Sequence, residues 1–85
     1  MVDVMNEVVR LLDEVLSLNG RSASFRRETP LLGALPELDS MAVVSLIGSL
    51  EDQFGLVVDD DEIDGETFAT LGSLVDFVSG KIATV

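Results

Sequence analysis

The sequence predicts a small all-α protein, a four-helix bundle of three main helices and one short helix, with a long first loop. Three segments place apolar residues three or four positions apart, as one buried face of a helix requires. No segment alternates apolar and polar residues for long enough to form a strand. The third observation is an irregular stretch over residues 19–39. The 85 residues are expected to form one domain, 1–85, with a thin core.

The first helix is expected over residues 2–18. Asp3 lies near its start, where a negative charge is favoured by the helix dipole. Asn19-Gly20 provides a stop signal at the other end. The predicted buried face consists of Val4, Val8, Leu11, Leu12, Val15 and Leu16.

The connection over residues 19–39 contains two prolines and has no clear period. A loop of this length is unusual in a compact domain and is often functional. It also carries apolar residues that need burial, so we expect it to wrap across the helices. These anchors are Phe25, Leu31, Leu32, Leu35 and Leu38.

The second helix is expected over residues 40–54. Asp39 and Ser40 are both good capping residues at its start, and Gly55 ends it. A short helical turn is expected at Thr67-Phe68-Ala69. The last helix then runs from Thr70 or Leu71 to about Ala83. The buried faces are Val43, Leu46, Ile47, Leu50 and Phe54 in the second helix, and Leu71, Leu74, Val75, Val78 and Ile82 in the last.

Composition excludes several classes of function. The net charge of −11, from 16 acidic and 5 basic residues, argues against nucleic-acid binding, because phosphate contacts need Lys and Arg. Without cysteine or histidine there is no disulfide, no Cys/His metal site and no common general base, so we expect no enzyme. No apolar run is long enough to cross a membrane, and the N-terminus does not resemble a signal peptide. We therefore expect a cytoplasmic protein without membrane insertion.

The acidic segment after the second helix imitates the opening of a calcium-binding loop. Asp60, Glu62 and Asp64 alternate before Gly65. The twelfth position of such a loop needs a bidentate glutamate, and here it is Leu71. We therefore predict no metal site and a solvated acidic loop.

The decisive segment is Leu38-Asp39-Ser40-Met41, which opens an apolar helix ending in Phe54-Gly55. It resembles the Asp-Ser-Leu signature of acyl and peptidyl carrier proteins. The elements that flank it also follow the order of that family, including the stretch Thr-Leu-Gly-Ser-Leu-Val-Asp-Phe-Val that begins at Thr70. Without the resemblance, Ser40 would be interpreted only as a helix N-cap. The order of the flanking elements, which matches the family, favours Ser40 as the residue to which the family's prosthetic group is attached.

The resemblance implies that 4'-phosphopantetheine is transferred from coenzyme A to the Ser40 hydroxyl. It also implies that Asp39 helps the transferase to recognise the site. Acyl groups would ride as thioesters on this arm in fatty-acid, polyketide or more specialised pathways. The implied partners are a phosphopantetheinyl transferase, an acyl-loading ligase or acyltransferase, and a ketosynthase or other acyl-using enzyme, all acting on a monomeric carrier.

The resemblance further implies a docking face and an acyl pocket. The docking residues are Met41, Val44, Gly48 and Glu51, and the pocket residues are Ile47, Leu50, Ile63, Phe68, Leu71 and Leu74. Fatty-acid-synthase carriers usually bear acids soon after the serine, where this chain has Ala42 and Ser45. We therefore expect a carrier for a specialised pathway. A peptidyl carrier, or an interaction module of the same fold without the arm, remain as alternatives.

Overall fold

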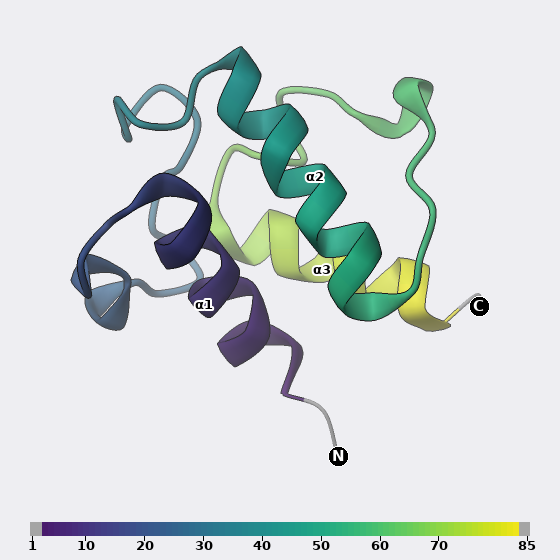
Figure 1. The fold of residues 1–85 in the computed structure, drawn as a ribbon, viewed down its shortest axis with the longest axis horizontal. Coiled ribbons are helices and arrows are strands. Elements are labelled where there is room, and N and C mark those ends of the chain that lie inside the picture. Colours follow the sequence, from purple (N-terminus) through teal and green to yellow (C-terminus); the bar gives the residue numbers. More distant parts are fainter. Residues whose placement is uncertain (1–2, 84–85) are drawn as a thin grey trace.

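The structure, a computed structural model, describes residues 3–83 and contains three α-helices (Figure 1). They are α1 (Val4–Leu16), α2 (Ser40–Phe54) and α3 (Leu71–Ala83). Two short 3₁₀ helices, η1 (Arg21–Ser24) and η2 (Asp60–Glu62), lie in the connections. Over residues 3–83 there is no strand, only an isolated bridge between Pro30 and Thr70. The predicted all-α fold is therefore confirmed.

The first helix is shorter than the predicted 2–18. Asp3 is its N-cap, and the Asp3 Oδ1 accepts a hydrogen bond from the Asn6 amide at 3.3 Å. The helix ends at Leu16 because Ser17 turns into the left-handed region, with φ of 54°. Its amide still donates to the Asp13 carbonyl, as in a helix C-cap. Val2, the predicted first residue, lies outside the described residues.

The predicted short helix at Thr67–Ala69 is wrong in position. Those residues form a turn, in which the Asp64 Oδ1 accepts hydrogen bonds from the Thr67 amide at 2.9 Å and the Thr67 hydroxyl at 3.0 Å. This i, i+3 bond has the spacing of a helix N-cap, but the turn that it opens is not continued as a helix. The helical turn occurs at η2 instead, where the Glu62 carboxylate accepts the Asp59 amide at 3.0 Å. This bond, from a backbone amide to the glutamate three residues later, is one of the two hydrogen bonds of a capping box.

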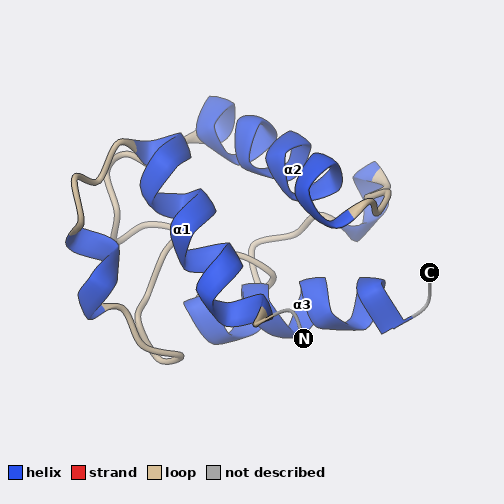
Figure 2. Cartoon of the chain, turned by 60° about the horizontal axis from the view of Figure 1, so that its bottom comes forward, coloured by secondary structure: helices blue, strands red, loops and turns tan. Residues whose placement is uncertain are grey.

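The core lies where α1 packs against both α2 and α3 (Figure 2). The predicted helix faces supply most of it, although Val4, Val15, Val43, Phe54 and Ile82 are only partly buried. Leu18 and Leu56, just beyond α1 and α2, close its edges. The largest side chains with less than 2% exposure are Leu12, Leu18, Leu31, Leu46, Leu50, Leu71, Leu74, Val8 and Val78.

The first loop caps α3 through its backbone. The Leu71 amide donates to the Thr29 carbonyl at 2.9 Å, and the Gly72 amide donates to the Arg27 carbonyl at 2.7 Å. These are two of the amides that a helix start leaves without intrahelical partners. Thr70 and Ser73 add a reciprocal pair of side-chain bonds, each hydroxyl accepting the amide of the other residue at 3.1 Å. The loop is therefore part of the helical framework.

The loop anchors follow the prediction with one exception. Leu31 and Leu38 are buried, and Phe25 and Leu35 are half-buried. Leu32 is 43% exposed, so its predicted burial is wrong. Leu32 begins the turn of residues 32–34 that follows the buried Leu31, and its side chain lies at the surface. This exposed leucine lies beside Ser40, as described below.

Candidate functional site

Ser40 is the first residue of α2, the helix that starts at the top of Figure 1, and the Ser40 side chain is exposed. Asp39 is the N-cap, and its Oδ1 accepts the Ala42 amide at 2.8 Å. The cap leaves the Ser40 hydroxyl without a hydrogen bond to any residue that the structure describes. A phosphate on this hydroxyl would lie at the positive end of the helix dipole. The position therefore fits a covalently attached phosphate ester.

A hollow of about 670 Å³ opens directly beside Ser40. The first loop and the segment that precedes α3 form its walls, and its interior is mainly apolar. We call it the Ser40 hollow. Its apolar side chains are Leu32, Leu38, Val43, Ile63 and Phe68. A hydrogen bond from the Leu32 amide to the Phe68 carbonyl, at 2.9 Å, joins the two segments that form these walls.

A second, smaller hollow of about 280 Å³ lies along α2, and we call it the Gly48 groove. It runs between α2 and the segment after it, and Ile63 lines both cavities. Its lining is Val44, Ile47, Gly48, Glu51, Val58 and Ile63. Three of the four predicted docking residues therefore border one groove.

The predicted docking strip is open to solvent. Met41 is 76% exposed and Val44 is 67% exposed, while Gly48 is exposed as well. Glu51 is half-buried, and its carboxylate accepts the Val58 amide at 3.0 Å. Glu51 therefore also stabilises the wall of the groove.

The six predicted pocket residues divide into two sets. Ile47, Ile63 and Phe68 line the two cavities. Leu50, Leu71 and Leu74 have at most 1% exposure and belong to the closed core, where they line neither cavity. Sequence reasoning missed Leu32 and Val43 as lining residues. Val43 had a usable signal, because it follows Ser40 by three positions on α2 and so lies on the same face.

Ion pairs secure the segments around the site. Arg21 pairs with Glu37, and the hydrogen bond from this guanidinium lowers the pKa of the Glu37 carboxyl. On the other side, the Lys81 ammonium contacts both carboxylate oxygens of Glu62 at 2.7 and 2.9 Å. That hydrogen bond lowers the pKa of Glu62. The lysine thus connects the last turns of α3 to η2.

The acidic segment after α2 does not form a metal site within the residues that the structure describes. Over the described residues, no three acidic side chains converge as ligands for a metal ion. Asp64 is engaged by Thr67, and these hydrogen bonds lower the pKa of the Asp64 carboxyl. The side chain of Asp60 lies outside the described part.

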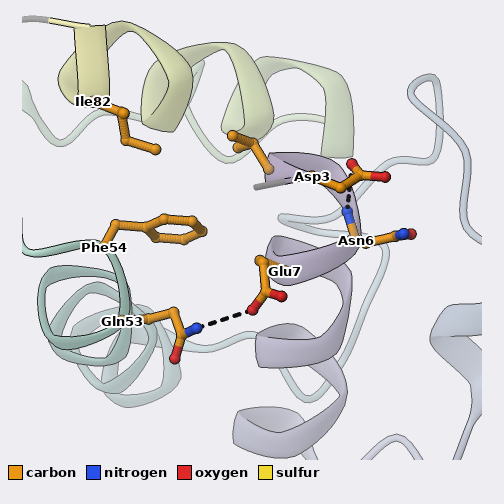
Figure 3. Close-up of a pocket in the computed structure, with 7 residues that line it drawn as sticks. Asp3, Asn6, Glu7, Gln53, Phe54 and Ile82 are labelled. Carbon is orange, nitrogen blue, oxygen red and sulfur yellow. Dashed lines mark hydrogen bonds between the residues drawn. The ribbon is translucent and has the colours of Figure 1, made fainter. Parts of the chain in front are cut away.

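A third cavity, of about 620 Å³, lies at the opposite end of α2 from Ser40. Figure 3 shows the first turn of α1 facing Phe54 of α2 and Ile82 of α3 across it. Beside this cavity the Gln53 side-chain amide of α2 donates a hydrogen bond of 2.9 Å to the Glu7 carboxylate of α1. No residue of the predicted site lines this cavity.

The family model described as "Phosphopantetheine attachment site" matches residues 6–78. This match spans α1 to α3 and includes the exposed serine at the start of α2. The chain belongs to the acyl carrier protein family. Members of this family are carriers and not enzymes, and 4'-phosphopantetheine is their covalent cofactor. They interact with acyl-using enzymes in general.

Known acyl carrier proteins resemble this chain in sequence and in structure. An acyl carrier protein of Bacillus anthracis, AsbD, is 33% identical over 86% of this chain and 78% of its own length. One from an Exiguobacterium species is 32% identical over 96% of this chain and 92% of its own. The solution structure of a holo acyl carrier protein from Nitrosomonas europaea superposes with a TM-score of 0.89 at 46% identity. It covers 96% of this chain and 99% of that one.

No helix within residues 3–83 is long and apolar enough to cross a membrane.

Proposed function

We propose that this acyl carrier protein bears its phosphopantetheine arm on Ser40 and serves a specialised acyl-transfer pathway. The observation that carries the proposal is the exposed Ser40 hydroxyl at the capped start of α2, beside an apolar hollow. The hydroxyl attacks the β-phosphorus of coenzyme A. A phosphodiester forms at Ser40, and 3',5'-adenosine bisphosphate leaves. We also propose that the carrier is cytoplasmic, where coenzyme A is available to supply the arm.

Asp39 is proposed to serve the transferase as well as the helix. Its Oδ1 is occupied by the Ala42 amide, while the exposed carboxylate keeps a second oxygen toward solvent. A carboxylate next to the acceptor hydroxyl suits recognition by a transferase, either directly or through a metal ion on that enzyme.

The docking face proposed for partner enzymes is the strip of Met41, Val44, Gly48 and Glu51. Its support is the exposure of large apolar side chains on α2, which soluble proteins rarely cluster without a partner. The segment after α2, whose Val58 and Ile63 border the same groove, carries exposed acids at Asp59, Asp61 and Asp64. α2 itself has no acid in its first turn. This distribution favours partners with a basic surface matched to that segment.

The proposed cargo is an acyl group, and its proposed pocket is bordered by Ile47, Ile63 and Phe68, which line the two cavities. Leu50, Leu71 and Leu74, the other three residues expected there, lie behind them in the closed core and are reached only if the pocket deepens. Phe68 and Ile63 begin it, since both line the Ser40 hollow. A freestanding peptidyl carrier stays the second candidate, because the docking helix is poor in acids near Ser40.

The decisive experiment measures intact mass after incubation with coenzyme A and a broad-specificity phosphopantetheinyl transferase. We expect the mass of one arm to be added, and no addition in Ser40→Ala. Ser45→Ala, which changes an exposed serine one turn further along α2, is the matched control and is expected to be modified normally. Modification of the Ser40→Ala variant would contradict the attachment site.

The pathway is tested separately with the holo protein. We expect the housekeeping ketosynthase and malonyl transferase of the source organism to use it poorly. Introducing acids by Ala42→Glu and Ser45→Glu is expected to increase that use. Normal use of the unmodified carrier by these enzymes would contradict a specialised role.

A further inference from the structure

The cavity at the far end of α2 from Ser40 has no part in the proposed function. Its volume is about 620 Å³, within the range of cavities that bind small ligands. Phe54 and Ile82, in the last turns of α2 and α3, face the first turn of α1 across it (Figure 3). We call it the Glu7 cavity, and its lining is Asp3, Val4, Asn6, Glu7, Gln53, Phe54 and Ile82.

The Glu7 carboxylate keeps one oxygen for a further partner. Its Oε2 accepts hydrogen bonds from both the Arg10 guanidinium and the Gln53 side-chain amide. Its Oε1 has no hydrogen-bond partner within residues 3–83. The Glu7 side chain is only 24% exposed, so a cation that reaches Oε1 is less screened by water than one at the open surface. Arg10 does not line the cavity, and its 65% exposed side chain forms a weak surface pair.

The other charges around the cavity also favour a positive group. Asp3 caps α1 through Oδ1, and its Oδ2 has no hydrogen bond to a residue that the structure describes. Both α2 and α3 end here, so the negative ends of two helix dipoles lie at the cavity. None of its described lining residues is basic, and Lys81, beside Ile82 in the chain, is bound to Glu62.

The apolar part of the lining indicates which cation fits best. Val4, Phe54 and Ile82 are half-buried and supply this part. An arginine side chain has an aliphatic stem that packs against such residues. Its planar guanidinium forms paired hydrogen bonds with a carboxylate and stacks on an aromatic ring, whereas a lysine ammonium is a compact point charge. Glu7 offers the carboxylate and Phe54 the ring.

Charge and position together indicate whose arginine this is. A second copy of the chain also carries a net charge of −11, so the two copies repel each other. A different protein with a basic surface is attracted instead. The cavity lies about 21 Å from Ser40 along the axis of α2. A protein bound there therefore leaves the proposed attachment site uncovered.

We propose that the Glu7 cavity is a second recognition site, which receives an arginine side chain of a partner protein. The guanidinium lies between the Glu7 carboxylate and the Phe54 ring, with Asp3 at the edge. The partner holds the carrier by this end while Ser40, at the other end of α2, stays accessible to the enzymes that act on it. Binding at the cavity does not require the arm, so it is tested independently of the proposed function.

The test titrates the isotope-labelled full chain with the peptide N-acetyl-Leu-Arg-Leu-amide and follows the amide chemical shifts. We expect saturable shifts at Asn6, Gln53 and Ile82, and none at Ser40 or Gly48. The same peptide with citrulline keeps the shape of arginine without its charge, and we expect it to bind about tenfold more weakly, as for loss of one charge-assisted hydrogen bond. A peptide with lysine is expected to bind severalfold more weakly than the arginine peptide.

Two substitutions locate the binding. Glu7→Gln removes the charge inside the cavity and is expected to weaken binding about tenfold. Glu14→Gln is the matched control, because Glu14 is an exposed acid of the same helix that does not line the cavity. It lowers the net charge equally and is expected to leave binding unchanged. Phe54→Leu, which keeps an apolar side chain without the ring, is expected to weaken binding severalfold.

Access to Ser40 is measured with the peptide bound. The initial rate of arm transfer by a broad-specificity transferase is expected to be the same with and without saturating peptide, and Ser40→Ala is expected to bind the peptide normally. A failure of attachment therefore shows in the mass of the protein and not in the titration.

Several results would overturn the proposal without the use of any variant. Equal binding of the citrulline peptide would remove the role of charge. Shifts concentrated at Asp59 and Asp61 would indicate general attraction to acidic surface. Slower arm transfer with bound peptide would contradict the access to Ser40, and shifts of Asn6 and Gln53 with protein concentration alone would assign the cavity to a second copy.

Discussion

At the scale of the residue, two glycines on α3 have opposite requirements. A Cβ at Gly72 would lie 2.9 Å from the Arg27 carbonyl oxygen and 3.2 Å from the Arg27 Cβ. The first of these atoms is backbone that accepts the Gly72 amide, so it has little freedom to move. A Cβ at Gly80, by contrast, would meet no atom within 4 Å.

We therefore expect Gly72→Ala to lower the free energy of unfolding by about 1–3 kcal/mol through overpacking. Gly80→Ala, on the same helix, is expected to raise it by about 0.5–1 kcal/mol through helix propensity. Urea unfolding of both variants measures the difference. Equal effects of the two substitutions would mean that the first loop moves freely away from α3.

Asp39 combines a structural role with a proposed functional one, and substitutions separate them. Asp39→Asn keeps a capping oxygen for the Ala42 amide, so we expect stability within a few tenths of a kcal/mol of the original. Asp39→Ala removes the cap and is expected to cost about 1 kcal/mol. If the charge serves the transferase, both variants lose at least tenfold in the initial rate of arm transfer. A normal rate for Asp39→Asn would reduce Asp39 to a helix cap.

At the scale of the element, the first loop is fastened to α1 by one buried serine. The Ser22 hydroxyl donates to the Asp13 carboxylate at 2.6 Å, and the Gly20 amide donates to the same oxygen at 3.0 Å. The hydrogen bond from Ser22 is the main reason that the pKa of Asp13 is lowered. It favours the charged form of the carboxylate in the folded state.

Ser22→Ala is expected to raise the pKa of Asp13 toward its ordinary value. Since the folded pKa is below the unfolded one, the stabilisation exists above the unfolded value and is lost as pH falls through the folded value. The variant is therefore expected to be less stable than the original at pH 7 and nearly equal to it at pH 2. Side-chain carboxyl NMR titration and urea unfolding at both pH values measure this. A stability difference that does not change with pH would assign the effect of Ser22 to packing.

The sequence predicts the elements whose signals are local. The bounds of α2 are as expected because Asp39 and Gly55 mark its ends within the chain itself. The same holds for α3, which starts at Leu71. The η2 turn was missed because the Asp59–Glu62 capping pair lies inside an acidic run, where the charges obscure it.

The candidate site is predictable in part for the same reason. Ser40, Asp39 and the exposed strip of α2 follow from one helix start and its periodicity. The lining of the Ser40 hollow does not, because Leu32 and Phe68 meet only through a backbone hydrogen bond between distant segments. Periodicity correctly places Leu50 and Leu74 in the core, but it does not show that Ile63 lies at the edge of the core beside the two cavities.

At the scale of the whole molecule, excess negative charge opposes folding. The net charge is −11, and among the described residues few of the acids are paired with a basic side chain. Such self-repulsion destabilises a compact state and is screened by salt over a Debye length of about 10 Å at 0.1 M. Screening also weakens the surface ion pairs, but exposed pairs contribute little.

We therefore expect the melting temperature at pH 7 to rise by several degrees between low salt and about 0.5 M sodium chloride. In a domain of this size about 1 kcal/mol corresponds to roughly 4–8 °C. Asp61→Asn, which removes one exposed acid, is expected to raise the melting temperature at low salt and to reduce the gain from salt. A melting temperature that falls steadily with salt would mean that the ion pairs outweigh the repulsion.

The backbone capping of α3 by the first loop divides the domain into parts that open differently. The ion pair from Arg27 to Asp76, adjacent to these caps, joins positions 49 apart in the sequence. The Leu71 and Gly72 amides are bonded to the loop, so they exchange with solvent only when the two halves of the chain separate. The η2 segment is tied to α3 by the Lys81–Glu62 ion pair and to α2 by the Glu51–Val58 hydrogen bond, and breaking these side-chain contacts opens it without separating the two halves. The first loop and α3 are therefore expected to unfold together, whereas the η2 segment can open by itself.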